Sequence, residues 1–104
     1  MIPVKTVRVG PFVIAIEHLK DEDRDSNFGA FWSGRQMIGM RDQFPNGALE
    51  AETLLHELLH AIYWAMGIRP KDTEERIIGL MSTGLAMAIR DNPKLFQWLS
   101  EALK

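Results

Sequence analysis

The chain contains no cysteine, so disulfide bonds and thiolate metal ligands are both excluded. It also lacks a long apolar run. The one short apolar run near the amino terminus, Phe12 to Ile16, is interrupted at Glu17 and is too short for a signal peptide or a membrane span. We therefore expect a cytoplasmic protein, including the case of a protein that is released into the cytosol.

A strong excess of either charge is absent as well, because 12 basic and 14 acidic residues leave a net charge of −2. That balance argues against nucleic acid or an anionic membrane as the main partner. The 46% apolar content suits a small globular core, and 104 residues correspond to one compact domain. No repeat, low-complexity tract or linker divides the sequence, so we treat residues 1–104 as a single domain.

The first half of the sequence has the pattern of β-strands. Residues 4–9, VKTVRV, alternate apolar and polar side chains, and residues 12–19, FVIAIEHL, form a second β-rich run. Residues 28–40, FGAFWSGRQMIGM, predict a hairpin with its turn near Gly34. The charged residues 21–27, DEDRDSN, predict a solvated loop. These segments together predict a small antiparallel sheet of three to four strands.

The second half predicts three helices, and the first of them has clear ends. It extends from about Ala48 to Met66, with Asn46 as a candidate cap. Gly67 is suited to end it, because glycine readily adopts the left-handed conformation found just after helices. We expect this helix to pack against the sheet.

The two later helices also carry cap signals. The second begins near Asp72 or Thr73 and ends near Arg90, and Asp72 with Glu75 three residues later resembles a capping box. Asn92 caps a third helix that has a proline at its first position. The sequence therefore predicts an α+β fold: a small antiparallel sheet packed against the first helix, followed by two further helices.

The first predicted helix contains the segment HELLH, in which His56 and His60 are two of the chain's three histidines. At about 100° per residue both fall on one face of the helix. An i, i+4 pair can converge on one ion at Zn–N distances of about 2.0–2.1 Å. Glu57 lies to one side, so it suits a metal-activated water better than the metal itself. We expect His56 and His60 to bind a metal and Glu57 to act as a general base.

The same count places the apolar residues of this helix on the opposite face: Leu55, Leu58, Leu59, Ile62 and Met66. We therefore expect the helix to dock on the sheet through them and to present both histidines and Glu57 on its other side. The alternative is a surface cluster without a metal, but three specified residues, two of a rare type, seldom coincide at this spacing.

Two histidines leave a catalytic zinc ion short of a third protein ligand. His18 lies in a predicted strand, where histidines are more often structural. Glu74 and Glu75 begin the second helix, which a short connection makes a neighbour of the first. Glu74 projects into the middle of that helix's apolar face. Glu75 lies at the edge of the face, above a stripe of small residues that permits close approach: Gly79, Ser82 and Ala86. We favour Glu75 as the third ligand, the alternative being a helix-capping role.

HELLH, together with Glu75 fifteen residues after His60, resembles a minimal zincin metallopeptidase of the gluzincin type. The segment EERIIGLMSTGLAMAIRDNP is similar to small phage- and prophage-encoded zincin-like proteins distantly related to ImmA/IrrE-type peptidases. The resemblance implies one zinc ion held by His56, His60 and Glu75, with Glu57 as the general base. It also implies a peptide or protein substrate that pairs with an edge strand, here Gln36 to Met40.

The chain departs from related patterns at several positions. Metzincins have glycine and histidine where this chain has Tyr63 and Met66, so that branch is excluded. The ImmA/IrrE helix often has Glu-x-x-Ala-Asn, whereas this chain has Glu75-Arg76-Ile77-Ile78-Gly79. Tyr63 lies near the histidine face as a candidate to stabilise a transition state, although core packing is the more common role of such an aromatic residue.

Three functions are compatible with these residues. The first is zinc-dependent peptide hydrolysis, in which Glu57 takes a proton from water and passes it to the leaving amine. The second is a catalytically silent zinc-binding interaction or regulatory module on the same fold. The third is a metal-free interaction domain. We favour the first, because structural zinc sites are usually closed by four protein ligands and have no use for an uncoordinated carboxylate.

Overall fold

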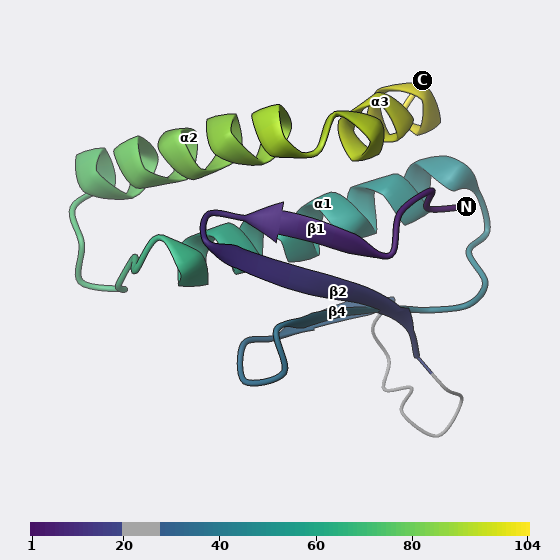
Figure 1. Cartoon of the computed structure of the whole chain (residues 1–104), viewed down its shortest axis with the longest axis horizontal. Coiled ribbons are helices and arrows are strands. Elements are labelled where there is room, and N and C mark those ends of the chain that lie inside the picture. Colours follow the sequence, from purple (N-terminus) through teal and green to yellow (C-terminus); the bar gives the residue numbers. More distant parts are fainter. Residues whose placement is uncertain (20–27) are drawn as a thin grey trace.

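The computed structural model describes residues 1–19 and 28–104 (Figure 1). The charged residues 21–27, predicted as a solvated loop, lie outside the described residues. The elements, in chain order, are β1 (Thr6–Val9), β2 (Phe12–His18), β3 (Gly29–Trp32), β4 (Met37–Met40), α1 (Gly47–Ala65), α2 (Glu74–Asp91) and α3 (Pro93–Ala102). The predicted α+β class is confirmed, with four strands followed by three helices.

The four strands form one sheet in the order β1-β2-β4-β3. β1 and β2 pair antiparallel across a turn at Gly10, whose φ is 58°, and β3 and β4 form the predicted antiparallel hairpin. β2 and β4 run parallel, with Ala15 opposite Met37. The sheet is therefore mixed, and not antiparallel throughout as the sequence indicated.

The strand order makes β3, and not β4, the edge strand at this end of the sheet. The prediction that Gln36 to Met40 forms an edge strand is wrong, because β4 pairs with β2 on one side and with β3 on the other. Its outer face is covered too: a Cβ added at Gly39 would lie 2.5 Å from Leu19 Cδ2 and 2.6 Å from Trp32 Cζ3. The edge at this end of the sheet is β3.

Helix α1 packs on one face of the sheet, and helix α2 runs antiparallel to α1 (Figure 1). The Asn46 side chain caps α1 by accepting a hydrogen bond from the Leu49 N–H at 2.8 Å, and Gly67 follows the helix with φ of 68°. Both predicted helix signals are confirmed. The core between sheet and helices contains Val7, Val9, Ile14, Ile38, Met40, Leu54, Leu58, Ile62, Leu95 and Leu99.

Helix α2 begins one residue later than a capping box at Asp72 requires. Thr73 is the N-cap, and its hydroxyl accepts a hydrogen bond from the Arg76 N–H at 3.2 Å. Asp72 instead accepts from the Arg69 N–H at 2.8 Å and forms an ion pair with Arg76. The predicted pairing of Asp72 with Glu75 is therefore wrong. Within residues 1–19 and 28–104, no helix has the length and apolar character needed to cross a bilayer.

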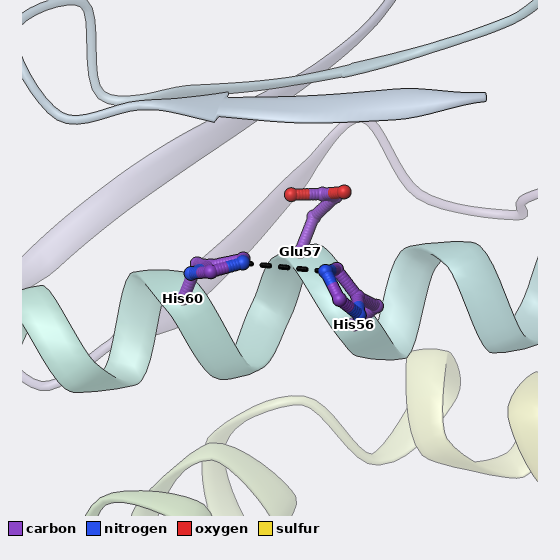
Figure 2. A group of neighbouring side chains, drawn as sticks. All are labelled: His56, Glu57 and His60. Atoms are coloured by element: carbon purple, nitrogen blue, oxygen red, sulfur yellow. Dashed lines mark hydrogen bonds between the residues drawn. The ribbon is translucent and has the colours of Figure 1, made fainter. Parts of the chain in front are cut away.

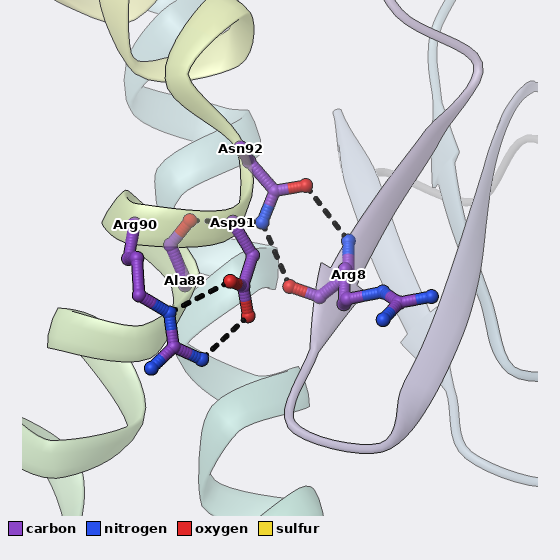
Figure 3. A network of polar contacts seen from close by, with 5 residues as sticks. All are labelled: Arg8, Ala88, Arg90, Asp91 and Asn92. Carbon is purple, nitrogen blue, oxygen red and sulfur yellow. Dashed lines mark hydrogen bonds and ion pairs between the residues drawn. The ribbon is translucent and has the colours of Figure 1, made fainter.

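The corner between α2 and α3 is tied to the sheet by Asn92 (Figure 3). Its side chain accepts a hydrogen bond from the Arg8 N–H at 2.9 Å and donates to the carbonyl oxygens of Arg8 and Ala88, each at 2.8 Å. Asn92 is the N-cap residue of α3 and Pro93 is at the start of the helix, as predicted. The Asn92 side chain makes no capping hydrogen bond to α3, because its amide is engaged by Arg8 and Ala88. Beside this corner, the hydrogen bond from Arg90 lowers the pKa of the Asp91 carboxyl below its ordinary value.

Candidate metal centre

The two histidines of α1 lie on the same side of the helix, with their Nε2 atoms 3.2 Å apart (Figure 2). Two nitrogen ligands of one tetrahedral zinc ion, each about 2.0–2.1 Å from it, are separated by roughly 3.3–3.4 Å. The rings are therefore at the separation that a shared ion requires. A hydrogen bond between neutral imidazoles has a similar length, so the contact fits both the metal-free and the metal-bound protein.

The candidate ligands form one compact group. Across residues 1–19 and 28–104, one group of three side chains is placed to hold a metal ion: His56, Glu57 and His60. Their ligand atoms all lie within 4.8 Å of one another. The structure thus brings together the three residues that the HELLH segment singled out. Their donors are two imidazole nitrogens and a carboxylate, which together could bind a metal ion.

The flank of α1 that carries Glu57 is covered by β3. The residue is only 7% exposed, and its carboxylate lies on the side of the helix that faces the strands (Figure 2). A Cβ added at Gly29 would come within 3.3 Å of Glu57 Cγ. The expectation that Glu57 shares the solvent-facing side of the histidines is wrong, because β3 covers this flank of the helix.

An open cleft of about 620 Å³ runs between β3 and α1, and all three residues line it. β3 and α1 run along the cleft in the same direction. Near the start of β3, Gly29 lies beside Thr53 and Glu57. Further along both elements, the ring of Phe31 lies 5.8 Å from that of Trp64. The candidate ligands therefore lie between the two ends of the cleft.

Gly29 shapes this cleft, although it was not among the site residues expected from the sequence. A Cβ at this position would lie 3.0 Å from Thr53 Cγ2 and 3.1 Å from the Gly39 carbonyl oxygen, as well as close to Glu57. The glycine lets β3 approach α1 closely while leaving room for the carboxylate. The only signal in the sequence is a pair of small residues, Gly29 and Ala30, in an otherwise bulky strand.

The other flank of the histidines faces α2 across a smaller cavity of about 370 Å³, lined by His56, Leu59, His60, Tyr63 and Met81. Leu59, predicted to dock on the sheet, is 37% exposed beside this cavity, so that placement is wrong. Tyr63 lies near the histidines, where the sequence placed it. The residue that α2 contributes to the cavity is Met81, a thioether and not a carboxylate.

The two glutamates in the first turn of α2 are exposed, and neither belongs to the metal-binding group. Helices α1 and α2 approach closely at Gly84, where an added Cβ would lie 2.6 Å from Ile62 Cγ2. The small-residue stripe that favoured Glu75 is exposed, and nothing lies within 4 Å of a Cβ added at Gly79. The close approach expected along that stripe is therefore wrong, and the assignment of the third ligand to Glu75 stays a prediction.

His18 lies at the end of β2, outside the group. Its Nδ1 is 3.4 Å from Asp42 Oδ1, and both side chains are exposed. No family model, curated protein or solved structure matches this chain. What the structure itself supports is a group of His56, Glu57 and His60 that could bind a metal ion.

Proposed function

We propose that the protein is a zinc-dependent peptide hydrolase in which His56 and His60 hold the ion and Glu57 is the general base. The observation that carries this proposal is the pair of Nε2 atoms at ligand separation, with a carboxylate close to both in an open cleft. When bound, zinc polarises a carbonyl group and makes water a stronger nucleophile at neutral pH.

Glu57 is suited to proton transfer by its position. It is nearly buried against β3, so its carboxylate has few alternative orientations, yet it lines the cleft where water and substrate have access. A carboxylate held in this way can take a proton from water and later deliver it to the leaving amine. His56 and His60, one helical turn apart, fix the position of the ion relative to this base.

The position of β3 supports a peptide or protein as the substrate. Among residues 1–19 and 28–104, β3 is an edge strand of the sheet, and it lines the cleft. Its outer backbone groups could therefore pair with an extended peptide. A peptide added along this edge would pass over His56 and His60, which would bring a backbone carbonyl to the site. This supports a peptide or protein substrate.

A catalytically silent metal-binding module is the second candidate, and Met81 is the observation that favours it. α2 presents the Met81 thioether to the histidine cavity and so offers no carboxylate ligand there. Catalytic zinc sites typically have three protein ligands and one open position. A site with only two histidine ligands would bind zinc more weakly.

The test compares wild type with Glu57→Gln after loading with zinc. Unstructured peptides are incubated with each protein, and the products are identified by mass spectrometry. We expect cleavage by wild type, suppression by a chelator, and loss of cleavage in Glu57→Gln with zinc retained. A zinc-loaded wild type that cleaves none of a diverse peptide mixture would identify the silent module as the correct function.

A further inference from the structure

The cleft has chemically different ends on the two sides of the histidines. Glu52 lines it one helical turn before His56, and Trp64 lines it one turn after His60. Phe28 lies on the Glu52 side, and Phe31 lies on the Trp64 side with its ring 5.8 Å from the indole. A ligand lying along the whole cleft therefore meets a carboxylate at one end and an indole at the other.

The charged residues that line the cleft are all acidic. Glu52 and Glu57 line it, and none of its lining residues is lysine or arginine. Glu52 is exposed and forms no ion pair with any residue of the described ranges 1–19 and 28–104. Arg41 stacks over the Phe28 ring at 4.7 Å but is not among the residues that line the cleft. A cationic side chain is the natural partner for Glu52.

The opposite end is apolar and held in place by packing. The indole of Trp64 lies 4.5 Å from the ring of Phe12 and 5.8 Å from that of Phe31, measured between centroids. Contacts with two rings restrict its orientation, and the part of Trp64 that lines the cleft offers apolar surface to a ligand. This end is suited to an apolar or aromatic side chain.

The spacing of the two ends sets the length of peptide that can use both. Glu52 and Trp64 are twelve positions apart on α1, which corresponds to about 18 Å at roughly 1.5 Å per residue. An extended peptide rises about 3.3 Å per residue, so five to six residues cover that distance. Because the histidines lie midway, each end corresponds to a substrate residue about two or three positions from the cleaved bond.

We propose that the cleft selects peptides with lysine or arginine two or three residues to one side of the cleaved bond and an apolar or aromatic residue at a similar distance on the other side. Glu52 and Trp64 are the residues that determine this specificity. The inference rests on the proposed peptidase function for the cleaved bond, but the recognition of side chains does not require that the bond be cut.

The experiment measures binding on zinc-loaded Glu57→Gln protein, so that affinity is determined without turnover. Three ten-residue peptides are compared: one with lysine near one end and leucine five residues away, one with glutamate in place of that lysine, and one with serine in place of the leucine. We expect the lysine–leucine peptide to bind about fivefold more tightly than either of the others, the size of effect of one exposed ion pair or one partly buried apolar side chain.

A second variant reverses the charge at the recognition site. Glu52→Lys, added to the Glu57→Gln background, should bind the glutamate peptide more tightly than the lysine peptide. Glu101→Lys on α3 makes the same change in net charge outside the cleft and should leave the preference unaltered. Circular dichroism of each variant establishes that it is folded.

Each outcome separates the specificity from the catalysis. Equal binding of all three peptides, or an equal shift in Glu101→Lys and Glu52→Lys, would overturn the specificity. The expected preference without cleavage by wild type would support the specificity and defeat the hydrolase proposal. Cleavage at bonds that show no such preference would support the hydrolase and overturn the specificity.

Discussion

The two flanks of the histidine pair differ in what they offer to a bound ion. On the β3 flank, the histidines open onto a cleft that also contains the buried carboxylate of Glu57. On the α2 flank they meet a cavity whose other lining residues are Leu59, Tyr63 and Met81. The candidate ligands and the carboxylate of Glu57 therefore lie on one helix beside one edge strand, whereas α2 contributes Met81 to the other cavity.

A glycine sets the approach on each flank, with different results. Gly29 lets β3 approach α1 while leaving room for the Glu57 side chain. Gly84 lets α2 approach α1, where an added Cβ would lie 2.6 Å from Ile62 and 2.9 Å from Met66. The first close approach shapes the cleft, and the second joins two helices. Substitutions on the two flanks should therefore have separable effects on the metal, on catalysis and on stability.

The largest expected effect comes from the residues between the flanks. His60→Ala should weaken zinc binding by roughly 100-fold or more, because loss of a direct ligand exceeds the 10–100-fold cost of losing an outer-sphere partner. Competition with a chromophoric chelator measures the affinity. Leu59→Ala, which changes a neighbouring exposed residue, serves as the control and should change the affinity by no more than a few fold.

On the β3 flank, Gly29→Ala should separate catalysis from metal binding. The added methyl group would press on Thr53, the Gly39 carbonyl and Glu57, so we expect a loss of about 1–3 kcal/mol in the free energy of unfolding. Displacement of Glu57 should lower peptide cleavage, while zinc affinity changes little. Gly34→Ala is the matched control, because nothing lies within 4 Å of a Cβ added there. Unchanged cleavage in a folded Gly29→Ala protein would contradict the role given to this contact.

On the α2 flank, Met81→Glu should supply the carboxylate that this side lacks. Because Met81 lines the histidine cavity, a carboxylate there would add a third ligand, and we expect zinc affinity to rise by about tenfold. Ser82→Glu adds the same charge on the exposed side of α2 and controls for long-range attraction. Equal gains in both variants would mean that the added charge acts at a distance and not as a ligand.

The smallest effect is expected at the start of α2. The sequence favoured Glu75 as the third ligand, but its small-residue stripe is exposed and the glutamates lie outside the metal-binding group. We expect Glu74→Ala and Glu75→Ala to change zinc affinity by less than about threefold, as is usual for exposed charges. If Glu75→Ala releases the metal and Glu74→Ala does not, the first turn of α2 supplies a ligand in the zinc-bound protein.

The features that were predicted correctly are local ones. The cap at Asn46, the stop at Gly67 and the shared face of His56 and His60 depend on residues within one or two helical turns. They could be predicted because helix geometry relates such neighbours directly. The hairpin of β3 and β4 belongs to the same category, since its strands are joined by a short turn.

The features that were wrong depend on tertiary arrangement. Residues 37–40 look like any short apolar strand, and only the parallel pairing of β2 with β4 shows that β3 is the edge. The helical wheel placed Glu57 correctly around α1, but it carried no information on which flank β3 covers. Gly79 and Gly84 are equally small, and no local pattern distinguishes the one that faces Ile62.

The most direct test is an anomalous diffraction map from crystals of the zinc-loaded protein, recorded on both sides of the zinc absorption edge. We predict one strong anomalous peak per chain, about 2.0–2.1 Å from the Nε2 atoms of His56 and His60, with Glu57 not a direct ligand. A peak elsewhere, no peak in protein soaked with excess zinc, or coordination in which Glu57 binds the ion directly would contradict this prediction.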